Sequence, residues 1–364
     1  MPDTPAAPQP AISARKADHI DLCTDGDVGF AAKTTLFDDL DFLHDALPEL
    51  AVSEIDLRTT FAGKQLQAPL IIAAMTGGVD RAERINRDLA SVAEELGIGF
   101  AFGSQRPLLT KGIRAGYEVR GVAPGALVLG NIGIVQAAET STAQLEELVQ
   151  TCGTDALCVH LNPAMEVVQP EGDDDFRHGL ATIERLVGEL SVPVIVKETG
   201  CGLSRAVGER IRALGVEWVD TSGSGGTSWV AVEMLRAADE DREVGVTFRD
   251  WGVPTAASVA QLSGLGLGIC ATGGVSDGLM VAKALALGAT CGGIARPFLQ
   301  AHARGGRDAA LRYGKRVIAE IRVACLLTGC RTPSELQQRP LVVGQRLRRW
   351  IPTGSPLAGR LAGL

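Results

Sequence analysis

Short apolar runs alternate with amphipathic stretches through most of the chain. Such near-continuous apolar runs are typical of parallel strands that are buried on both faces. The predicted strands are 69–75, 97–102, 126–129, 156–159, 193–196, 218–219, 265–271 and a last run that ends in Gly292-Gly-Ile-Ala-Arg296. The clearest helical patterns between them are 81–96, 142–151, 178–190 and 204–214. Eight such units favour a (β/α)8 TIM barrel. The alternative, an open doubly wound sheet, would carry Gly-x-Gly-x-x-Gly after its first strand, and this chain does not.

The same pattern predicts how the chain is divided. Residues 1–12 are rich in Pro and Ala and are predicted to be a disordered tail. Residues 13–65 are predicted to form an extension that caps the substrate site, 66–330 the barrel, and 331–364 a C-terminal extension with helices. Residues 302–330 are predicted to be a long helix, and the long connection 231–254 predicts an insertion near the site.

Composition narrows the class of protein. The 364 residues carry a net charge of −8, which argues against a nucleic-acid binder. Eight scattered cysteines without a Cys-x-x-Cys pair favour the reduced cytoplasm. The N-terminus has no signal-peptide core, and no apolar segment approaches membrane-spanning length, so we expect no membrane insertion.

Two glycine-rich turns follow the seventh and eighth predicted strands. They are Ala271-Thr-Gly-Gly-Val-Ser-Asp-Gly278, with Ser276 or Asp277 as the expected helix N-cap, and Gly292–Arg296. Glycines let backbone N–H groups approach an anion, and a helix N-terminus adds partial positive charge. In a TIM barrel these turns form the usual phosphate site. The alternative is two ordinary tight turns.

Polar residues follow six of the predicted strands, and a barrel brings them to one face. They are Thr76, Ser104, Arg106, Asn131, His160, Asn162, Lys197, Ser222 and Thr227. This set suits FMN, with Lys197 near the N1–C2=O edge and the glycine turns around the phosphate.

Charged residues predict a second anion site and a cation site. Arg15, Lys16 and His19 would join Arg106 if the N-terminal segment folds over the barrel mouth. Glu166 could share a hard cation such as Mg²⁺ with substrate phosphates. We expect Asp173–Asp175 to be a solvated loop and Cys201 to be a packed thiol.

Ten short motifs then occur in the order found in one known family, and they span nearly the whole chain after the first dozen residues. Together they resemble type 2 isopentenyl-diphosphate isomerase. They are Arg15-Lys-Ala-Asp-His19, Met75-Thr-Gly-Gly78, Gly103-Ser-Gln-Arg106, Gly130-Asn131, His160-Leu-Asn162, Pro170-Glu-Gly172, Lys197-Glu198, Ser222-Gly-Ser-Gly-Gly-Thr227, Trp251-Gly-Val-Pro-Thr255 and Thr272-Gly-Gly274.

The resemblance implies an FMN-dependent homotetramer that interconverts isopentenyl and dimethylallyl diphosphate. It implies reduced FMN with N5 as acid and base, Mg²⁺ bound by Glu166, and NADPH as reductant. The implied FMN-binding residues are Met75, Thr76, Gly77, Ser104, Asn131, Lys197, Ser222, Thr227, Gly273, Gly274, Ala295 and Arg296. The implied substrate-binding residues are Arg15, Lys16, His19, Ser104, Gln105, Arg106, Asn162 and Met165.

One position departs from the family pattern. Met165 stands where the family has a glutamine directly before the metal-binding glutamate, and that glutamine is thought to assist proton transfer. A thioether has no proton to relay, so no side chain is assigned a catalytic role, although His160 lies nearby. Three alternatives therefore stay open beside the family reaction: a diverged isomerase or cyclase for another isoprenoid, a non-catalytic FMN-binding protein, and a 2-hydroxy-acid oxidase. The oxidase would need His-Gly-Gly where this chain has Thr272-Gly-Gly274.

Overall fold

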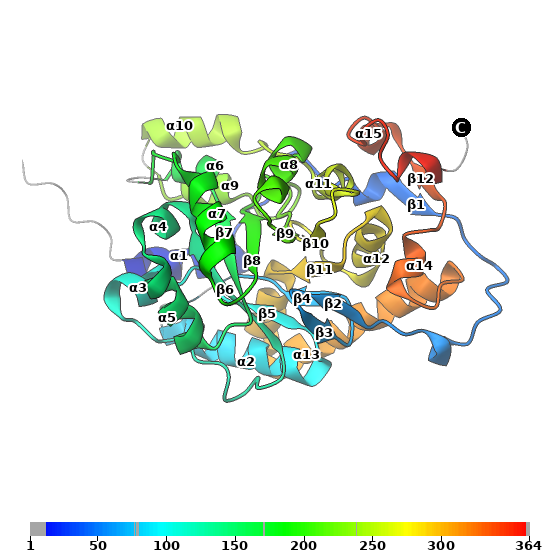
Figure 1. Cartoon of the computed structure of the whole chain (residues 1–364), viewed down its shortest axis with the longest axis horizontal. Helices are drawn as coiled ribbons and strands as arrows, with labels where there is room; N and C mark the ends of the chain where they lie inside the picture. Colours follow the sequence, from blue (N-terminus) through cyan, green and yellow to red (C-terminus); the bar gives the residue numbers. More distant parts are fainter. Residues whose placement is uncertain (1–11, 76, 78–79, 170–171, 238, 362–364) are drawn as a thin grey trace, which may run out of the picture.

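Eight parallel strands close into a barrel, so the predicted (β/α)8 fold is confirmed (Figure 1). The computed structural model describes residues 12–75, 77, 80–169, 172–237 and 239–361. Most of the predicted tail therefore lies outside the described residues. In barrel order the strands are β4 (Leu70–Ile72), β5 (Gly99–Ala101), β6 (Leu127–Gly133), β7 (Ala156–Leu161), β8 (Val194–Glu198), β9 (Trp218–Asp220), β10 (Gly268–Ala271) and β11 (Cys291–Ile294). β11 pairs with β4 and closes the ring.

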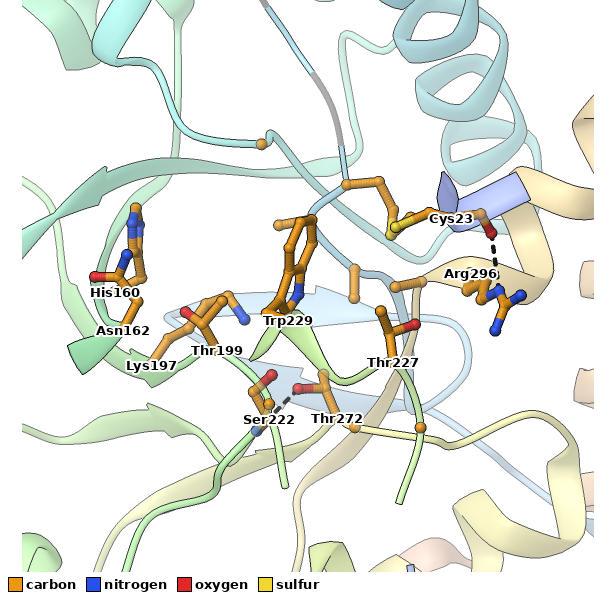
Figure 2. A pocket seen from close by; sticks show the side chains of 18 of the residues that line it. Cys23, His160, Asn162, Lys197, Thr199, Ser222, Thr227, Trp229, Thr272 and Arg296 are labelled. Carbon is orange, nitrogen blue, oxygen red and sulfur yellow. Dashed lines mark hydrogen bonds between the residues drawn. The ribbon is translucent and has the colours of Figure 1, made fainter. Parts of the chain in front are cut away.

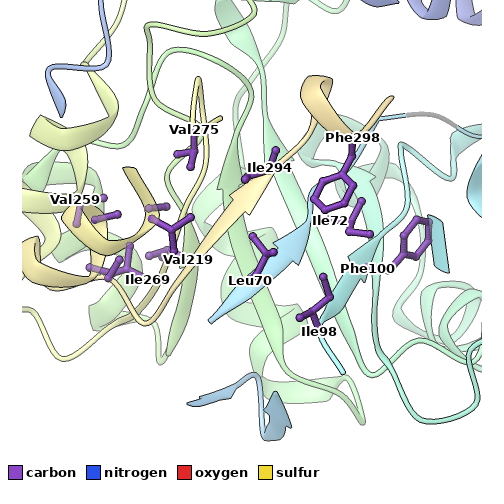
Figure 3. Close-up of a cluster of buried hydrophobic side chains, with 14 of the residues drawn as sticks. Leu70, Ile72, Ile98, Phe100, Val219, Val259, Ile269, Val275, Ile294 and Phe298 are labelled. Carbon is purple, nitrogen blue, oxygen red and sulfur yellow. The ribbon is translucent and has the colours of Figure 1, made fainter. Parts of the chain in front are cut away.

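Alternate strand residues serve two separate apolar layers, which explains why each run is apolar throughout. Leu70 and Ile72 pack with the surrounding helices in a cluster that includes Ile294 and Phe298 (Figure 3). Ile71, between them, belongs to a second cluster inside the barrel. That interior uses small residues, with Cys158, Cys270 and Cys291 among them.

Helices surround the barrel and connect its strands. The barrel helices are α2 (Asp80–Leu96), α3 (Arg106–Lys111), α4 (Ile134–Glu139), α5 (Thr142–Cys152), α6 (Pro163–Glu166), α7 (Gly179–Glu189), α8 (Arg205–Ala213), α9 (Trp229–Met234), α10 (Asp239–Phe248), α11 (Thr255–Leu262), α12 (Gly278–Leu287) and α13 (Arg296–Leu327). The long helix thus begins before the predicted residue 302, and its geometry breaks at Gly305 and Gly306, where φ at Gly306 is 60°.

Further segments lie outside the barrel and its helices. They are α1 (Ile12–Asp25), β1 (Leu40–Phe42), β2 (Thr59–Phe61), β3 (Lys64–Leu66), α14 (Pro333–Leu336), β12 (Leu341–Val343), α15 (Gln345–Arg348) and the 3₁₀ turns η1 (Phe37–Asp39), η2 (Val52–Glu54) and η3 (Ala358–Arg360). The predicted N- and C-terminal extensions meet, because β1 pairs with β12 in an antiparallel ladder.

The β2–β3 hairpin closes the amino ends of the barrel strands. Phe61 is fully buried in the interior cluster, and its ring centroid lies 4.9 Å from that of Trp218, the first residue of β9. Lys64 Nζ donates to the carbonyl of Ala126, directly before β6, at 2.8 Å. The predicted capping extension is therefore divided between the two ends of the barrel. Its helix α1 lies at the carboxyl end of the strands, whereas the β2–β3 hairpin lies at the amino end.

Three strands run at least two residues further than predicted, and this changes where polar side chains lie. β6 continues to Gly133, because Gly133 still pairs with His160 of β7, and His160 in turn pairs with Lys197 of β8. Asn131, His160 and Lys197 are therefore strand residues rather than loop residues. Strand positions are held by ladder hydrogen bonds on both sides, which fixes these side chains rigidly at the barrel mouth.

Candidate active site

A cavity of about 540 Å³ opens at the carboxyl ends of the barrel strands. This is within the range of ~300–1,000 Å³ that small-molecule and cofactor sites occupy. The predicted site residues that line it are His19, Met75, Gly77, Ser104, Arg106, Asn131, His160, Asn162, Met165, Glu166, Lys197, Ser222, Thr227, Gly273, Gly274, Ala295 and Arg296. The structure thus brings together residues from α1 and from the ends of all eight strands.

Of the remaining predicted site residues, Gln105 is the one whose side chain is described. Gln105 is buried and turned away from the cavity, because its Oε1 accepts from Asn131 N at 2.7 Å and its Nε2 donates to Cys152 Sγ at 3.0 Å. Gln105 therefore holds β6 in place instead of facing a substrate. Thr76 lies outside the described residues, and Arg15 and Lys16 belong to α1 while their side chains lie outside the described part.

One end of the cavity, here called the phosphate-type end, is formed by the backbone of the glycine-rich turns and by the N-termini of the helices that follow them. The turns after β9 and β10 approach so closely that a Cβ on Gly226 would lie 2.3 Å from Gly274 N. Asp277 caps α12, as one of the two predicted candidates, and accepts from Met280 N at 2.7 Å. Glu320 also accepts from Gly278 N at 2.7 Å, so carboxylates already occupy that helix start. The N-terminus of α13, at Arg296 on the cavity wall, is therefore the better anion site.

Lys197 places a buried cation on the cavity wall. Its Nζ donates to the Glu198 carbonyl at 3.0 Å and lies 3.6 Å from Asp220 Oδ2. Ser222, two residues after the end of β9, has a φ of 35°, which is a strained value for a residue with a side chain. Its N–H donates to Thr272 Oγ1 at 3.0 Å (Figure 2). Thr199 also lines the cavity, and its buried Oγ1 has no hydrogen-bond partner in the described part of the chain.

A polar relay fixes the imidazole of His160. His160 Nδ1 and Asn131 Oδ1 lie 2.8 Å apart, and Asn131 Nδ2 donates to the Phe102 carbonyl at 3.0 Å. Since Asn131 Oδ1 can only accept, His160 Nδ1 carries the proton in this contact. The relay orients a ring that lines the cavity.

Glu166 is the centre of a buried cluster. Its Oε1 accepts from Asn162 Nδ2 at 2.5 Å, and its Oε2 accepts from Asp173 N at 3.0 Å and from Gln169 Nε2 at 3.3 Å. No group of three or more His, Cys, Asp and Glu residues with metal-binding geometry occurs among the described residues. Any cation at Glu166 would therefore complete its shell with water and substrate oxygens.

The expectation of a solvated loop at Asp173–Asp175 is wrong for Asp173. Gln136 Nε2 donates to Asp173 Oδ2 at 2.7 Å, and Arg106 Nη1 lies 3.9 Å from the same oxygen. Asp173 thus connects the predicted anion-binding arginine to the Glu166 cluster. Asp175 is exposed and pairs with Arg177, as a solvated loop residue would.

Helix α1 lies across the cavity mouth. His19 Nε2 lies 2.7 Å from Glu233 Oε1, and Arg236 contacts the other oxygen at 2.6 Å. Burial alone would raise the pKa of the Glu233 carboxyl, but His19 and Arg236 hold it below its usual value. Arg296 donates to the carbonyls of Cys23 at 2.8 Å and Gly26 at 2.7 Å, so it ties the end of α1 to the barrel (Figure 2).

Two groups beside Lys197 have shifted pKa values. Burial raises the pKa of the Glu198 carboxyl to about 8, although the backbone N–H groups of Cys201 and Gly202 donate to it. Burial likewise raises the pKa of the Cys201 thiol to about 12. Cys201 stays protonated at neutral pH, in line with the packed thiol expected from the sequence.

Sequence reasoning missed several lining residues. Trp229 projects into the cavity between Thr199 and Thr227 in the view of Figure 2, and its ring lies 5.2 Å from that of His19. A signal was present, because Ser228 caps α9 directly after the glycine-rich turn. Gln136, Gln169 and Thr199 also line the cavity, but no spacing rule pointed to them.

The donors around the cavity fit FMN. The α13 N-terminus and the Gly226 and Gly274 turns can take a phosphate, and Lys197 can face an electron-rich ring edge. Thr199 Oγ1, which is buried without a partner among the described residues, can bond to a ligand. We find no competing carboxylate at the α13 N-terminus among the described contacts.

Comparison with known proteins agrees with the geometry. The pattern of the FMN-dependent dehydrogenase family matches residues 9–166 and 160–343. The isopentenyl-diphosphate delta-isomerase of Thermococcus kodakarensis is 42% identical over 348 residues, which cover 93% of each chain. That of Halobacterium salinarum is 42% identical over 93% of this chain and 95% of its own, and that of Sulfurisphaera tokodaii is 39% identical over 94% of each.

Solved structures support the fold. A mandelate oxidase variant with a monooxide FMN adduct has a TM-score of 0.63 at 16% identity, covering 89% of this chain and 95% of its own. A flavocytochrome b2 variant with benzoylformate has a TM-score of 0.65 at 19% identity, covering 88% and 81%. At such low sequence identities, these similarities show that the fold is shared and say nothing about the reaction. The match along the whole sequence decides the family: this chain belongs to the isopentenyl-diphosphate delta-isomerases, within the wider FMN-dependent dehydrogenase family.

Proposed function

We propose that this protein interconverts isopentenyl and dimethylallyl diphosphate with reduced FMN and Mg²⁺. The observation that supports this best is the composition of one cavity. It combines a phosphate-type end at α13 and the glycine turns with a second polar end formed by His19, Arg106 and Glu166. One anion site would suffice for FMN, whereas two suit FMN together with a diphosphate substrate.

In this proposal, the residues of the protein bind and orient FMN, Mg²⁺ and the substrate. The α13 N-terminus and the Gly273–Gly274 turn would hold the FMN phosphate, with Lys197 at the ring. Arg106 and His19 would bind the substrate diphosphate, and Glu166 would hold Mg²⁺ against it. Reduced FMN supplies a proton donor and acceptor at N5. Trp229 and α1 cover the mouth and limit the access of water to the reacting carbons.

Met165 favours a second candidate, the same chemistry on a different isoprenoid. Met165 lines the cavity beside Glu166, on a short helix that contacts α9 and thus the segment that begins with Trp229. A thioether and an indole make an apolar wall where a glutamine would offer a polar one. Such a wall suits a longer or more substituted prenyl chain.

The 2-hydroxy-acid oxidase alternative lacks its base. Thr272 stands where that reaction would need a histidine, and Thr272 Oγ1 donates to Asp220 in the barrel wall. Asp220 in turn lies beside Lys197. A side chain committed to this contact cannot take the proton of a substrate hydroxyl.

The resemblance extends the proposal to the setting of the enzyme. We propose NADPH as the reductant of the flavin, a homotetramer as the assembly and the cytoplasm as the compartment. Within the described residues, none of the helices combines the length and the apolar character that crossing a bilayer demands.

A comparison of substrates tests the proposal. Protein loaded with FMN is mixed anaerobically with isopentenyl diphosphate, Mg²⁺ and dithionite, and separately with mandelate and oxidised FMN. We expect dimethylallyl diphosphate only with the reduced flavin, and no bleaching of the flavin by mandelate. Bleaching by mandelate without isomerisation would assign the protein to the oxidases, and FMN binding without any turnover would make it a non-catalytic flavoprotein.

A further inference from the structure

Gln169 is a buried glutamine of the cavity wall that contacts Glu166 and takes no part in the proposed function. It lies one turn beyond α6, where its N–H donates to the carbonyls of Met165 at 3.0 Å and Glu166 at 3.1 Å. Its residue exposure is 7%. Backbone and burial together hold this side chain in a fixed place beside Glu166.

The two ends of the Gln169 amide have different surroundings. Nε2 donates to Glu166 Oε2 at 3.3 Å, whereas Oε1 is buried and has no hydrogen-bond partner in the described part of the chain. The opposite orientation would set an amide oxygen against a carboxylate oxygen, so the orientation follows from charge. A buried carbonyl oxygen without a donor is unfavourable, and in a cavity wall it calls for a donor from the ligand.

The donor can be deduced from the cation that Glu166 would hold. Mg²⁺ keeps several of its waters when a protein offers it few carboxylates, and each metal-bound water donates hydrogen bonds. The residue before Glu166 cannot accept them well, because Met165 has a soft thioether and hard cations prefer oxygen surroundings. Among the described residues that contact Glu166, Gln169 carries a fully buried acceptor, Oε1, that has no hydrogen-bond partner.

We propose that Gln169 is a positioning residue of the cation site, whose Oε1 accepts a hydrogen bond from a water molecule bound to the Mg²⁺ at Glu166. This inference rests on the proposed function for the presence of Mg²⁺. It assigns Gln169 to orienting the hydrated cation and Nε2 to orienting the Glu166 carboxylate. Partners of this outer kind typically change metal affinity by about 10–100-fold.

Calorimetry with two probes tests the proposal. FMN-loaded protein is titrated with the 1:1 complex of Mn²⁺ and inorganic diphosphate, and separately with metal-free inorganic diphosphate in the presence of EDTA. For Gln169→Met we expect about 10–100-fold weaker binding of the Mn²⁺ complex, and unchanged binding of metal-free diphosphate. Gln169→Glu keeps an acceptor oxygen and should therefore bind the Mn²⁺ complex more tightly than Gln169→Met does.

Controls separate this role from simple packing. Gln150→Met makes the same change in an exposed glutamine outside the cavity, whose Nε2 donates to the Glu146 carboxylate at 3.0 Å, and should leave binding of the Mn²⁺ complex unaffected. If Gln169→Met weakens both probes equally, or if Gln169→Glu behaves like Gln169→Met, the proposal is overturned. If the wild type binds the Mn²⁺ complex no more tightly than metal-free diphosphate, both the cation part of the proposed function and this inference are wrong. If Mn²⁺ tightens binding equally in the wild type and in Gln169→Met, only the inference is wrong.

Discussion

At the scale of single residues, Met165 is the position where this chain and its family differ in chemistry. Replacing it by glutamine would restore a polar group that can relay protons, and positioned acid or base groups are typically worth about 10²–10⁴-fold in rate. We expect Met165→Gln to raise kcat for isopentenyl diphosphate by at least about tenfold. Val167→Gln is the matched control, because Val167 follows on the same turn and is 61% exposed. An unchanged kcat in Met165→Gln would show that this position does not limit the reaction.

Glu198 gives a second residue-scale prediction, on pH. Its pKa is raised to about 8 by burial, above the usual value near 4.5, so the folded state prefers the protonated carboxyl. Its contribution to stability is complete below pH 4.5 and is lost as the pH rises through 8. One such group changes the free energy of unfolding by up to about 1.4 kcal/mol per pH unit in this window.

Urea unfolding between pH 5 and 8 measures this effect. Glu198→Gln, which stays neutral, should remove part of the decline seen in the wild type. The exposed Glu147→Gln should retain the full decline. Equal slopes in Glu198→Gln and wild type would mean that Glu198 is ionised throughout the window.

At the scale of elements, Arg296 joins α1 to α13. Its guanidinium contacts two carbonyls at the end of α1, and lysine cannot reproduce a forked contact of this kind. We expect Arg296→Lys in the FMN-free protein to speed backbone hydrogen exchange in residues 12–25 by about tenfold or more. The exposed Arg304→Lys, on the same helix, should leave that exchange unchanged. Unaltered exchange in Arg296→Lys would mean that His19 and Glu233 suffice to hold α1.

Elements were predictable from the sequence to different degrees. The strands followed from apolar periodicity, because each strand serves two apolar layers, and so did the longer helices at 81–96, 142–151, 178–190 and 204–214. The strand ends did not follow. Asn131 and His160 are polar and read as turn residues, yet ladder pairing with neighbouring strands keeps them extended. Pairing is a tertiary effect and leaves no local signal.

At the scale of the whole molecule, the β2–β3 hairpin and the cavity lie at opposite ends of the barrel. We therefore expect residues of the hairpin to affect the stability of the fold and not the binding of ligands in the cavity. Truncating a fully buried phenylalanine typically costs about 3–5 kcal/mol. We therefore expect Phe61→Ala to lower the free energy of unfolding by that amount and to leave the FMN dissociation constant within about twofold. Leu47→Ala, at 83% exposure, should change neither quantity by much. A large loss of FMN affinity in Phe61→Ala would show that the two ends are coupled.

Much of the site was also accessible from sequence, since barrel topology alone gathers the residues after eight strands. What stayed hidden depends on contacts between distant segments. Asp173 reads as part of an acidic, solvated run, but it contacts Gln136 and Arg106, two residues of the cavity wall. Gln105 belongs to a substrate motif, yet its amide is taken up by Asn131 and Cys152. A motif fixes the identity of a residue, and only packing decides which way it faces.

The central claim is that this cavity isomerises isopentenyl diphosphate, and proton NMR in D2O tests it most directly. FMN-loaded protein is reduced anaerobically with dithionite and incubated with Mg²⁺ and isopentenyl diphosphate. The account predicts dimethylallyl diphosphate that carries deuterium from the solvent, because isomerisation adds one proton and removes another. Isopentenyl diphosphate that returns without product and without deuterium, from protein shown to hold reduced FMN, would contradict it.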